Sequence, residues 1–188
     1  MEINVIKKIT NKIRETHHCD RYRKVQNLIN KKGKLLDVGC GRPCDSMENG
    51  SFIKFIGYGV GMDIKDCSSG SEFKKGDVLD IPFPEESFDI VVAMEILEHT
   101  DNIELALQNI YRVLKDDGIF IFSTPNNSLL WRIFWSIWKR SIGRMWIDSH
   151  KTDLNEKEWT KLLEKYFIIE KTDCNWLIDS IFKMRKRI

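Results

Sequence analysis

The stretch LLDVGCGRPCDS, residues 35–46, decides the fold. It opens with a short apolar run over 34–38, which is typical of a buried strand, and Gly39 and Gly41 follow directly. Glycines at this place allow a tight turn and let a ligand approach the backbone closely. A plain turn at the end of a strand has the same residues, so this pattern leaves both a structural turn and a ligand site open.

A carboxylate follows the two glycines at the spacing that nucleoside-binding sites use. Asp63 lies near the end of an apolar run at 58–64, and a carboxylate there accepts hydrogen bonds from both hydroxyls of a ribose. A solvated aspartate in a turn would look the same. The dinucleotide fingerprint has a third glycine where this chain has Cys44, and Pro43 lies where the loop would bend around a pyrophosphate. Nicotinamide binding is therefore the weaker interpretation.

Apolar runs alternate with helical patterns along most of the chain. The sequence predicts strands at 34–38, 58–64, 88–94, 119–123, 167–173 and 176–182. It predicts helices at 1–32 (in two pieces), 102–118 and 154–166, the last with Asn155 as its cap. This alternation indicates an α/β fold, with a mostly parallel sheet covered by helices on both faces. Ligands of such sheets bind outside the carboxyl ends of the strands.

Length and composition limit the class of protein. The 188 residues, 42% hydrophobic and 31% charged, suit a single globular domain over 1–188. The net charge of +2 gives little support for a nucleic-acid partner. The five cysteines have no CxxC spacing, which predicts reduced thiols and a cytoplasmic protein. We see no apolar run long enough for a signal peptide or a membrane span.

Four segments occur in an order and at spacings that are typical of one family. They are LLDVGCG (35–41), VGMDI (60–64), KGDVLDIPFPEESFDIVVAMEILEH (75–99) and ALQNIYRVLKDDGIFIFSTPN (106–126). Together they resemble the Rossmann-like S-adenosylmethionine-dependent methyltransferases, from about residue 34 to 170. The resemblance implies a doubly wound, mostly parallel sheet of seven strands. Pro43 departs from the family's third glycine, and the short segment 65–75 predicts a shortened crossover helix.

The resemblance implies a site for S-adenosylmethionine at the ends of the strands. Three residues at the end of the first strand and in the turn after it would border the methionine part of the cofactor: Asp37, Gly39 and Gly41. Asp63 would hold the ribose. Four residues would lie beside the adenine, with the carboxylate of Asp77 on its amino group: Ile64, Asp77, Val78 and Leu79. Glu95 would close the pocket at the carboxyl end of the fourth strand.

The run EILEH places Glu95, Glu98 and His99 together after that strand. It resembles two subsets of the family, the O-methyltransferases of the ubiquinone pathway and the small-RNA 3′-end 2′-O-methyltransferases. That resemblance implies a divalent cation, Mg²⁺, which lowers the pKa of an acceptor hydroxyl and fixes its position. His150 follows the STPN segment at 123–126 and would be a fourth candidate ligand.

Two further interpretations of this run stay open. Glu98 and His99 could be loop residues that cap the following helix. Alternatively His99 or His150 could serve as a metal-free general base, because an imidazole titrates near neutrality. His17 and His18 are predicted to be solvated residues of the first helix.

The segment SLLWRIFWSIWKRSIGRMWI, residues 128–147, is unusually apolar and basic. In a helix, Trp131, Trp135 and Trp138 would share one stripe, opposite a narrow basic face. So large an apolar face needs a cover, which could be the protein itself, an acceptor pocket, a second copy or an anionic membrane surface. We predict an insert or lid at 126–150 over the acceptor site. The tail KMRKRI (183–188) is predicted to be solvated, with phosphate contact as the alternative.

These observations predict an S-adenosylmethionine-dependent methyltransferase that acts on the oxygen of a small acceptor. An apolar, quinol-like or lipid- or glycan-linked acceptor is favoured because of the insert. RNA is the second candidate. The sequence also allows a cofactor-binding module without turnover. The predicted location is the cytoplasm, with peripheral contact to a membrane through 128–147.

Overall fold

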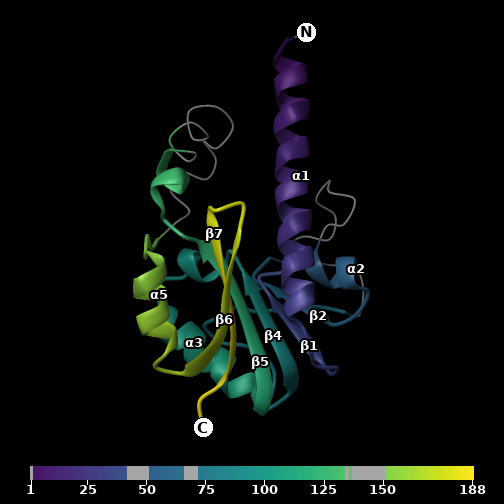
Figure 1. Ribbon diagram of the computed structural model, residues 1–188. Helices are drawn as coiled ribbons and strands as arrows, with labels where there is room; N and C mark the ends of the chain where they lie inside the picture. The colour runs from purple at the N-terminus through teal and green to yellow at the C-terminus, as the bar shows by residue number, and fades with distance from the viewer. Residues whose placement is uncertain (1, 42–50, 66–71, 134–135, 137–150) are drawn as a thin grey trace.

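The protein is described by a computed structural model that covers residues 2–41, 51–65, 72–133, 136 and 151–188, with side chains from residue 12 onward (Figure 1). Its centre is a seven-stranded sheet in the order β3-β2-β1-β4-β5-β7-β6. The strands are β1 (Leu35–Val38), β2 (Val60–Asp63), β3 (Phe73–Lys75), β4 (Phe88–Met94), β5 (Leu114–Pro125), β6 (Phe167–Asn175) and β7 (Asp179–Lys186). Only β7 runs antiparallel to its neighbours. The predicted α/β fold with a mostly parallel seven-stranded sheet is confirmed.

Helices cover both faces of the sheet (Figure 1). The helices α1 (Glu2–Leu28) and α2 (Phe52–Ile56) lie on one face, and α3 (Ile103–Val113) and α5 (Glu156–Leu163) lie on the other. A 3₁₀ turn, η1 (Leu97–His99), follows β4. The first helix is one continuous element and not the two pieces that the sequence predicted. Asn155 caps α5 as predicted, and Glu158 completes a capping box.

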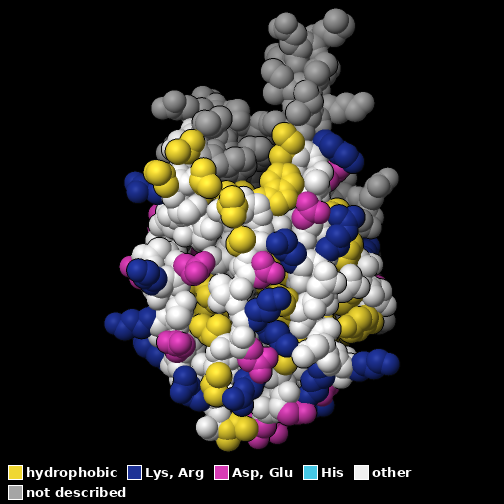
Figure 2. All heavy atoms as spheres, in the orientation of Figure 1, with side chains coloured by type: hydrophobic (Ala, Val, Ile, Leu, Met, Phe, Trp, Pro, Cys, Tyr) yellow, Lys and Arg dark blue, Asp and Glu magenta, His cyan; other side chains and the backbone are white. Residues whose placement is uncertain are grey.

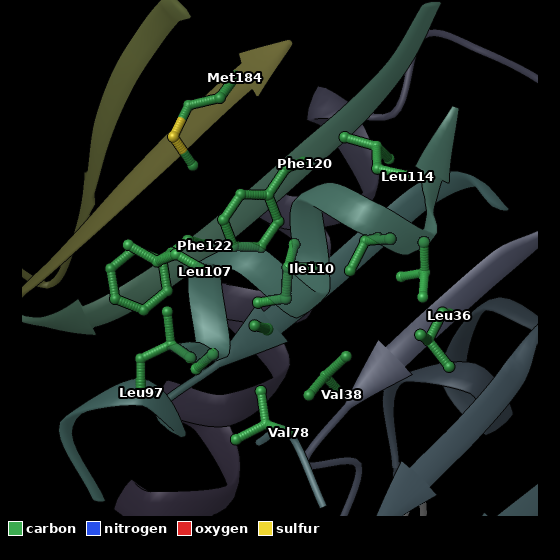
Figure 3. Close-up of a cluster of buried hydrophobic side chains, with 14 of the residues drawn as sticks. Leu36, Val38, Val78, Leu97, Leu107, Ile110, Leu114, Phe120, Phe122 and Met184 are labelled. Atoms are coloured by element: carbon green, nitrogen blue, oxygen red, sulfur yellow. The ribbon is translucent and has the colours of Figure 1, made fainter. Parts of the chain in front are cut away.

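The two faces separate because side chains of a strand alternate between them. In β4, Val91 packs with the α3 face of the sheet, and its neighbour Val92 packs with the α1 face. Figure 3 shows the first of these clusters, in which Phe120, Phe122 and other strand residues surround the apolar side of α3. Buried layers on both sides fix the register of the strands, since a shift by one residue would turn each apolar side chain to the wrong face.

The boundary between α3 and β5 differs from the prediction. The helix was predicted to run to Gly118, but it ends at Val113 and the strand begins at Leu114. Leu114 is fully buried and pairs with Phe88, and the register then shifts so that Ile119 pairs with Ile90. The pairing of the buried Leu114 with β4 therefore ends the helix, although the helical pattern of the sequence continues to Gly118.

The prediction that the basic tail is solvated is wrong for Lys183, Met184 and Lys186, which are buried, and right for Arg185, Arg187 and Ile188, which are exposed. Residues 183–186 belong to β7, which begins at Asp179 and not at 176. The ammonium group of Lys186 is buried, donates to the carbonyl of Leu114 and pairs with Asp116 at 2.9 Å. The β7 strand lies inside the sheet, and two of its basic residues, Lys183 and Lys186, are buried there.

Within the described residues, no helix is long and apolar enough to cross a membrane. The predicted shortened crossover helix lies mostly at 66–71, outside the described residues.

Candidate active site at the carboxyl ends of the strands

The end of β1 forms a tight glycine turn against β2. The backbone N–H groups of Gly39 and Cys40 both donate to the carbonyl of Met62, at 2.7 and 3.1 Å. Gly39 and Gly41 have φ values of 73° and 68°, which favour glycine. A Cβ at Gly39 would also lie 2.7 Å from the side chain of Ile96, which follows β4. The turn therefore requires glycine for its conformation and for its close contact with the end of β4.

Asp63 closes this turn. Its carboxylate accepts the N–H of Gly41 at 3.0 Å and the N–H of Lys65 at 2.9 Å. Two carboxylate oxygens offer about four acceptor positions, so capacity remains for the hydroxyls of a ribose. Asp63 thus lies where the resemblance places it, with an additional role in holding the turn.

Asp37 lies in β1 beneath the turn and is 2% exposed. Burial raises its pKa from 3.8 to about 8, and the charge of Asp63 adds to the shift. Tyr22 of α1 lies close enough for the charge of Asp37 to act on it; burial first, and then that charge, raises the pKa of Tyr22 to about 12. The first helix therefore reaches the cofactor side of the sheet.

Three of the predicted adenine residues, Asp77, Val78 and Leu79, lie on the loop between β3 and β4, and the fourth, Ile64, follows β2. The carboxylate of Asp77 accepts the N–H of Leu79 at 2.9 Å, and the carbonyl of Leu79 accepts from Asn109 of α3. Val78 is buried in the core, whereas Ile64 is 61% exposed after β2. Asp77 and Ile64 thus have the polar and apolar surfaces that an adenine site needs.

Glu95 lies directly after β4 with a left-handed backbone (φ 54°). Its N–H donates to the carbonyl of Ser123, and its Oε1 accepts from the hydroxyl of Ser123 at 3.0 Å. The guanidinium of Arg21 lies 3.4 Å from the same oxygen. Burial, and then the charge of Asp179, raise the pKa of Glu95, and Arg21 opposes them. The net result is a pKa raised from 4.5 to about 7.

Residues of α1 and β7 complete a buried polar cluster around Glu95. Arg21 is 4% exposed, and its Nη1 lies 3.5 Å from the carboxylate of Asp179. The Nε2 atom of His17 lies 2.8 Å from that same carboxylate, which also accepts from Asn175. We call Arg21, His17, Glu95, Glu98 and Asp179 the acid cluster. It joins segments far apart in the sequence.

The prediction that His17 and His18 are solvated is wrong. His17 belongs to the acid cluster, and the Nδ1 atom of His18 lies 2.7 Å from Arg21. Burial lowers the pKa of His18 well below its usual value, and the charge of Arg21 adds to this. The sequence spacing could have indicated this burial. Positions 17, 21, 25 and 28 form one stripe of the helix, and this stripe ends in the buried Val25 and Leu28.

Glu98 and His99 lie on η1. Glu98 is 2% exposed, and its backbone carbonyl accepts the N–H groups of Lys151 and Thr152. Burial and then the charge of Glu95 raise the pKa of the Glu98 carboxyl well above its usual value. The cap of α3 is Asn102, which accepts the N–H of Leu105 at 3.0 Å. Capping is therefore not the role of Glu98 or His99.

The described residues do not fit a magnesium site by themselves. Among them, no group of three histidine, cysteine or acidic side chains could hold a metal ion. Arg21 already places a positive charge beside Glu95. His150 lies outside the described residues, so its convergence with Glu95, Glu98 and His99 stays a prediction.

The described start of the predicted insert is helical and apolar. Helical backbone begins at residue 129, and the hydroxyl of Ser128 accepts the N–H of Trp131. Trp135 and Trp138 lie outside the described residues. Leu129, Leu130 and Ile133 are exposed, as are Trp176 and Leu177 in the turn between β6 and β7. Figure 2 shows hydrophobic side chains gathered at the upper end of this face.

Comparison with known proteins gives the class. Residues 36–122 match the family model described as a methyltransferase domain. Sterol 24-C-methyltransferase ERG6B of Gibberella zeae is 36% identical over 102 residues, which cover 46% of this chain and 26% of that protein. The chain thus spans about a quarter of the length of that relative.

Solved structures share the fold over nearly the whole chain. The PH0226 protein from Pyrococcus horikoshii superposes with a TM-score of 0.70 at 18% identity, covering 89% of this chain and 88% of that one. A methyltransferase from Thermotoga maritima gives a TM-score of 0.69 at 16% identity, covering 98% and 99%. The fold is that of the Rossmann-like methyltransferases. Residues 36–122 are thus similar to a methyltransferase domain, and the chain shares its fold with solved structures that include a methyltransferase.

The glycine turn fits the methyl donor of this class, S-adenosylmethionine. No described atom comes within 4 Å of the position of a Cβ at Gly41, the last described residue before 42–50. Asp63 beside it retains acceptor capacity, and the buried Asp37 lies below. The individual contacts of the cofactor with these residues stay predictions.

Proposed function

We propose that this protein transfers a methyl group from S-adenosylmethionine to the oxygen of a small, lipid-like acceptor. One observation carries the proposal: the glycine turn and the acid cluster adjoin at the same edge of the sheet. Gly39 packs against Ile96, the residue that follows Glu95. A donor held at the end of β1 and an acceptor held at the end of β4 would thus meet there.

The residues of this chain supply position and proton acceptance. S-adenosylmethionine, when bound, supplies a methyl group on a sulfonium, which is open to in-line displacement. Gly39 and Gly41 admit the cofactor to the backbone, and Asp63 holds its ribose. Glu95, whose pKa is raised to about 7, suits removal of a proton from an acceptor near neutral pH. Fixing both reactants in one geometry accounts for much of the rate gain in such transfers.

Two observations support a lipid-like acceptor. Exposed apolar side chains from two segments, 129–133 and 176–177, lie near the ends of β5 and β6. The carbonyl of Leu177 accepts from the side chains of Asn126 and Ser128, so the residues that lead into the first segment contact the second. The relative from Gibberella zeae is a sterol 24-C-methyltransferase, which supports a lipid acceptor for this chain, whereas the choice of oxygen rests on the resemblance of its EILEH run. Cytoplasmic location and peripheral membrane contact belong to the same proposal.

The proposal is tested first on the cofactor. Calorimetric titration should show binding of S-adenosylhomocysteine and no binding of NAD. Radiolabelled S-adenosylmethionine is then incubated with the protein and a cell extract, which is separated into lipid, RNA, protein and small-molecule fractions. Label in the lipid or small-molecule fraction supports the proposal. Label in RNA would move the function to the second candidate, and cofactor binding without any label would favour a binding module.

A further inference from the structure

Glu98 is a buried carboxylate whose oxygens have no hydrogen-bond partner among the described residues. The residue is 2% exposed, and both Oε1 and Oε2 are unsatisfied. A buried carboxylate without a partner is strongly unfavourable, so such a group needs a proton, a cation or a ligand that donates hydrogen bonds. The methyltransferase fold does not need this residue for packing, since Leu97 supplies the apolar contact of η1 with the core.

The cations of the acid cluster are engaged elsewhere. Arg21 directs its guanidinium at Glu95, Asp179 and His18. His17 pairs with Asp179. The cluster holds three carboxylates for one guanidinium and one imidazole, and Glu98 is the carboxylate that has no described partner.

Glu98 also lines a pocket at the end of β5, together with Thr124 and Pro125. Its other walls include Asn127, Thr152 and the indoles of Trp131 and Trp159. Trp159 is buried and packs on Phe122, whereas Trp131 is half-buried. The lining of the pocket thus includes an acidic residue and two tryptophans, and the exposed apolar residues 129–130 directly precede Trp131.

We infer that Glu98 and this pocket bind the polar end of the methyl acceptor, and that this end is a hydrogen-bond donor, a hydroxyl or an ammonium group. The inference rests on the proposed function and narrows its substrate class. Hydroxyl and ammonium groups both satisfy a carboxylate, and an ammonium also binds favourably to indole faces. A carboxylate or phosphate end group is disfavoured when Glu98 carries its charge, because it would lie beside two acidic side chains, Glu98 and Asp153, that line the same pocket.

The test uses three probes that share one alkyl chain: octan-1-ol, octylamine and octanoate. Each is titrated by NMR into protein saturated with S-adenosylhomocysteine. Octan-1-ol or octylamine should bind about tenfold or more tightly than octanoate, since a hydrogen bond to a charged group has this magnitude. The tighter of the two identifies the donor as a hydroxyl or an ammonium group.

Variants assign the preference to Glu98. In Glu98→Gln the preference over octanoate should fall to about twofold or less, because the charge is lost. Glu164→Gln, an exposed site on the far end of α5, should keep it. Glu98→Asp retains the charge and should keep the preference with weaker binding, and it replaces the first variant if Gln prevents folding.

The inference is overturned if octanoate binds as well as the other probes, or if none of the three probes binds. Retention of the preference in Glu98→Gln would also overturn it. Binding of S-adenosylhomocysteine, measured first on each variant, separates the two levels. Its absence from the unmodified protein contradicts the proposed function, whereas its presence without a head-group preference contradicts only the role of Glu98.

Discussion

The two halves of the site are built in different ways. The cofactor half, at the ends of β1 and β2, is local: backbone N–H groups of a short turn bind the carbonyl of Met62 and the carboxylate of Asp63. The acceptor half, at the ends of β4, β5 and β7, is assembled from side chains of α1, η1 and β7 around Glu95. The first half is defined by a motif and the second by tertiary packing.

This difference has an energetic side. Within the described residues, the glycine turn has no charged side chain except Asp63, and its hydrogen bonds are donated by backbone N–H groups. The acid cluster buries several ionisable groups against one another, whereas the cofactor half buries the single carboxylate of Asp37, and the pKa values of these groups shift as a result. We therefore expect substitutions in the cofactor half to change affinity and substitutions in the acceptor half to change stability.

The largest effect is expected from Arg21→Met. It leaves Glu95 and Asp179 without their guanidinium, and removal of one partner from a buried ion pair costs about 3–5 kcal/mol. Urea denaturation followed by circular dichroism measures the loss. Arg23→Met on the same helix is the matched control, because Arg23 is exposed and pairs only with Asp20; it should cost less than about 0.5 kcal/mol. Equal losses in both variants would show that the acid cluster does not stabilise α1 on the sheet.

Asp63→Ala should come second, with an effect on binding. The turn loses the acceptor for Gly41 and the ribose loses its carboxylate, so affinity for S-adenosylhomocysteine should fall about 10- to 100-fold. Calorimetry measures the change. Asp117→Ala, at the opposite edge of the sheet, should bind normally. Unchanged affinity in Asp63→Ala would contradict the ribose assignment.

Stability should fall as pH rises from 5 to 8. The pKa of Glu95 is raised on folding from 4.5 to about 7, so the stability linked to its proton is fully present below pH 4.5 and is lost as pH rises through 7. Asp37, with a pKa of about 8, acts in the same direction. The loss is about 1–3 kcal/mol, since part of the Glu95 side chain remains exposed. The urea midpoint, plotted against pH, should fall less steeply for Glu95→Gln than for the unmodified protein. An equal slope in both would show that Glu95 does not cause the loss.

The smallest expected effect concerns metal. Because Arg21 already lies beside Glu95, Mg²⁺ should not raise the melting temperature of the protein above its value in EDTA. Differential scanning fluorimetry checks this. A clear rise with Mg²⁺ would instead indicate that His150 completes a site with Glu95, Glu98 and His99.

The sequence predicted the local half of the site well because neighbouring residues determine it. Gly39, Gly41 and Asp63 could be identified from a strand that ends in glycines and from one spacing, and the structure brings them together. The acid cluster could not be predicted in the same way. The residues around Arg21 and Asp179 do not indicate that these two side chains meet, because 158 positions separate them. His17 and Arg21 are polar or charged, so the sequence suggested exposure although both lie on a buried stripe of α1. The end of α3 was missed for a similar reason, since the partner of Leu114 lies on β4.

The place of β7 in the sheet has a consequence for how the protein folds. The strand is the last element in chain order, yet it lies between β5 and β6 and brings Asp179 to the acid cluster. During synthesis, β5 therefore exposes an unpaired edge until residues 179–186 emerge, and exposed edges of this kind promote association between chains. Contacts of such large sequence separation also slow folding. A nascent chain would thus hold its glycine turn early and complete its acceptor site only after β7 has emerged.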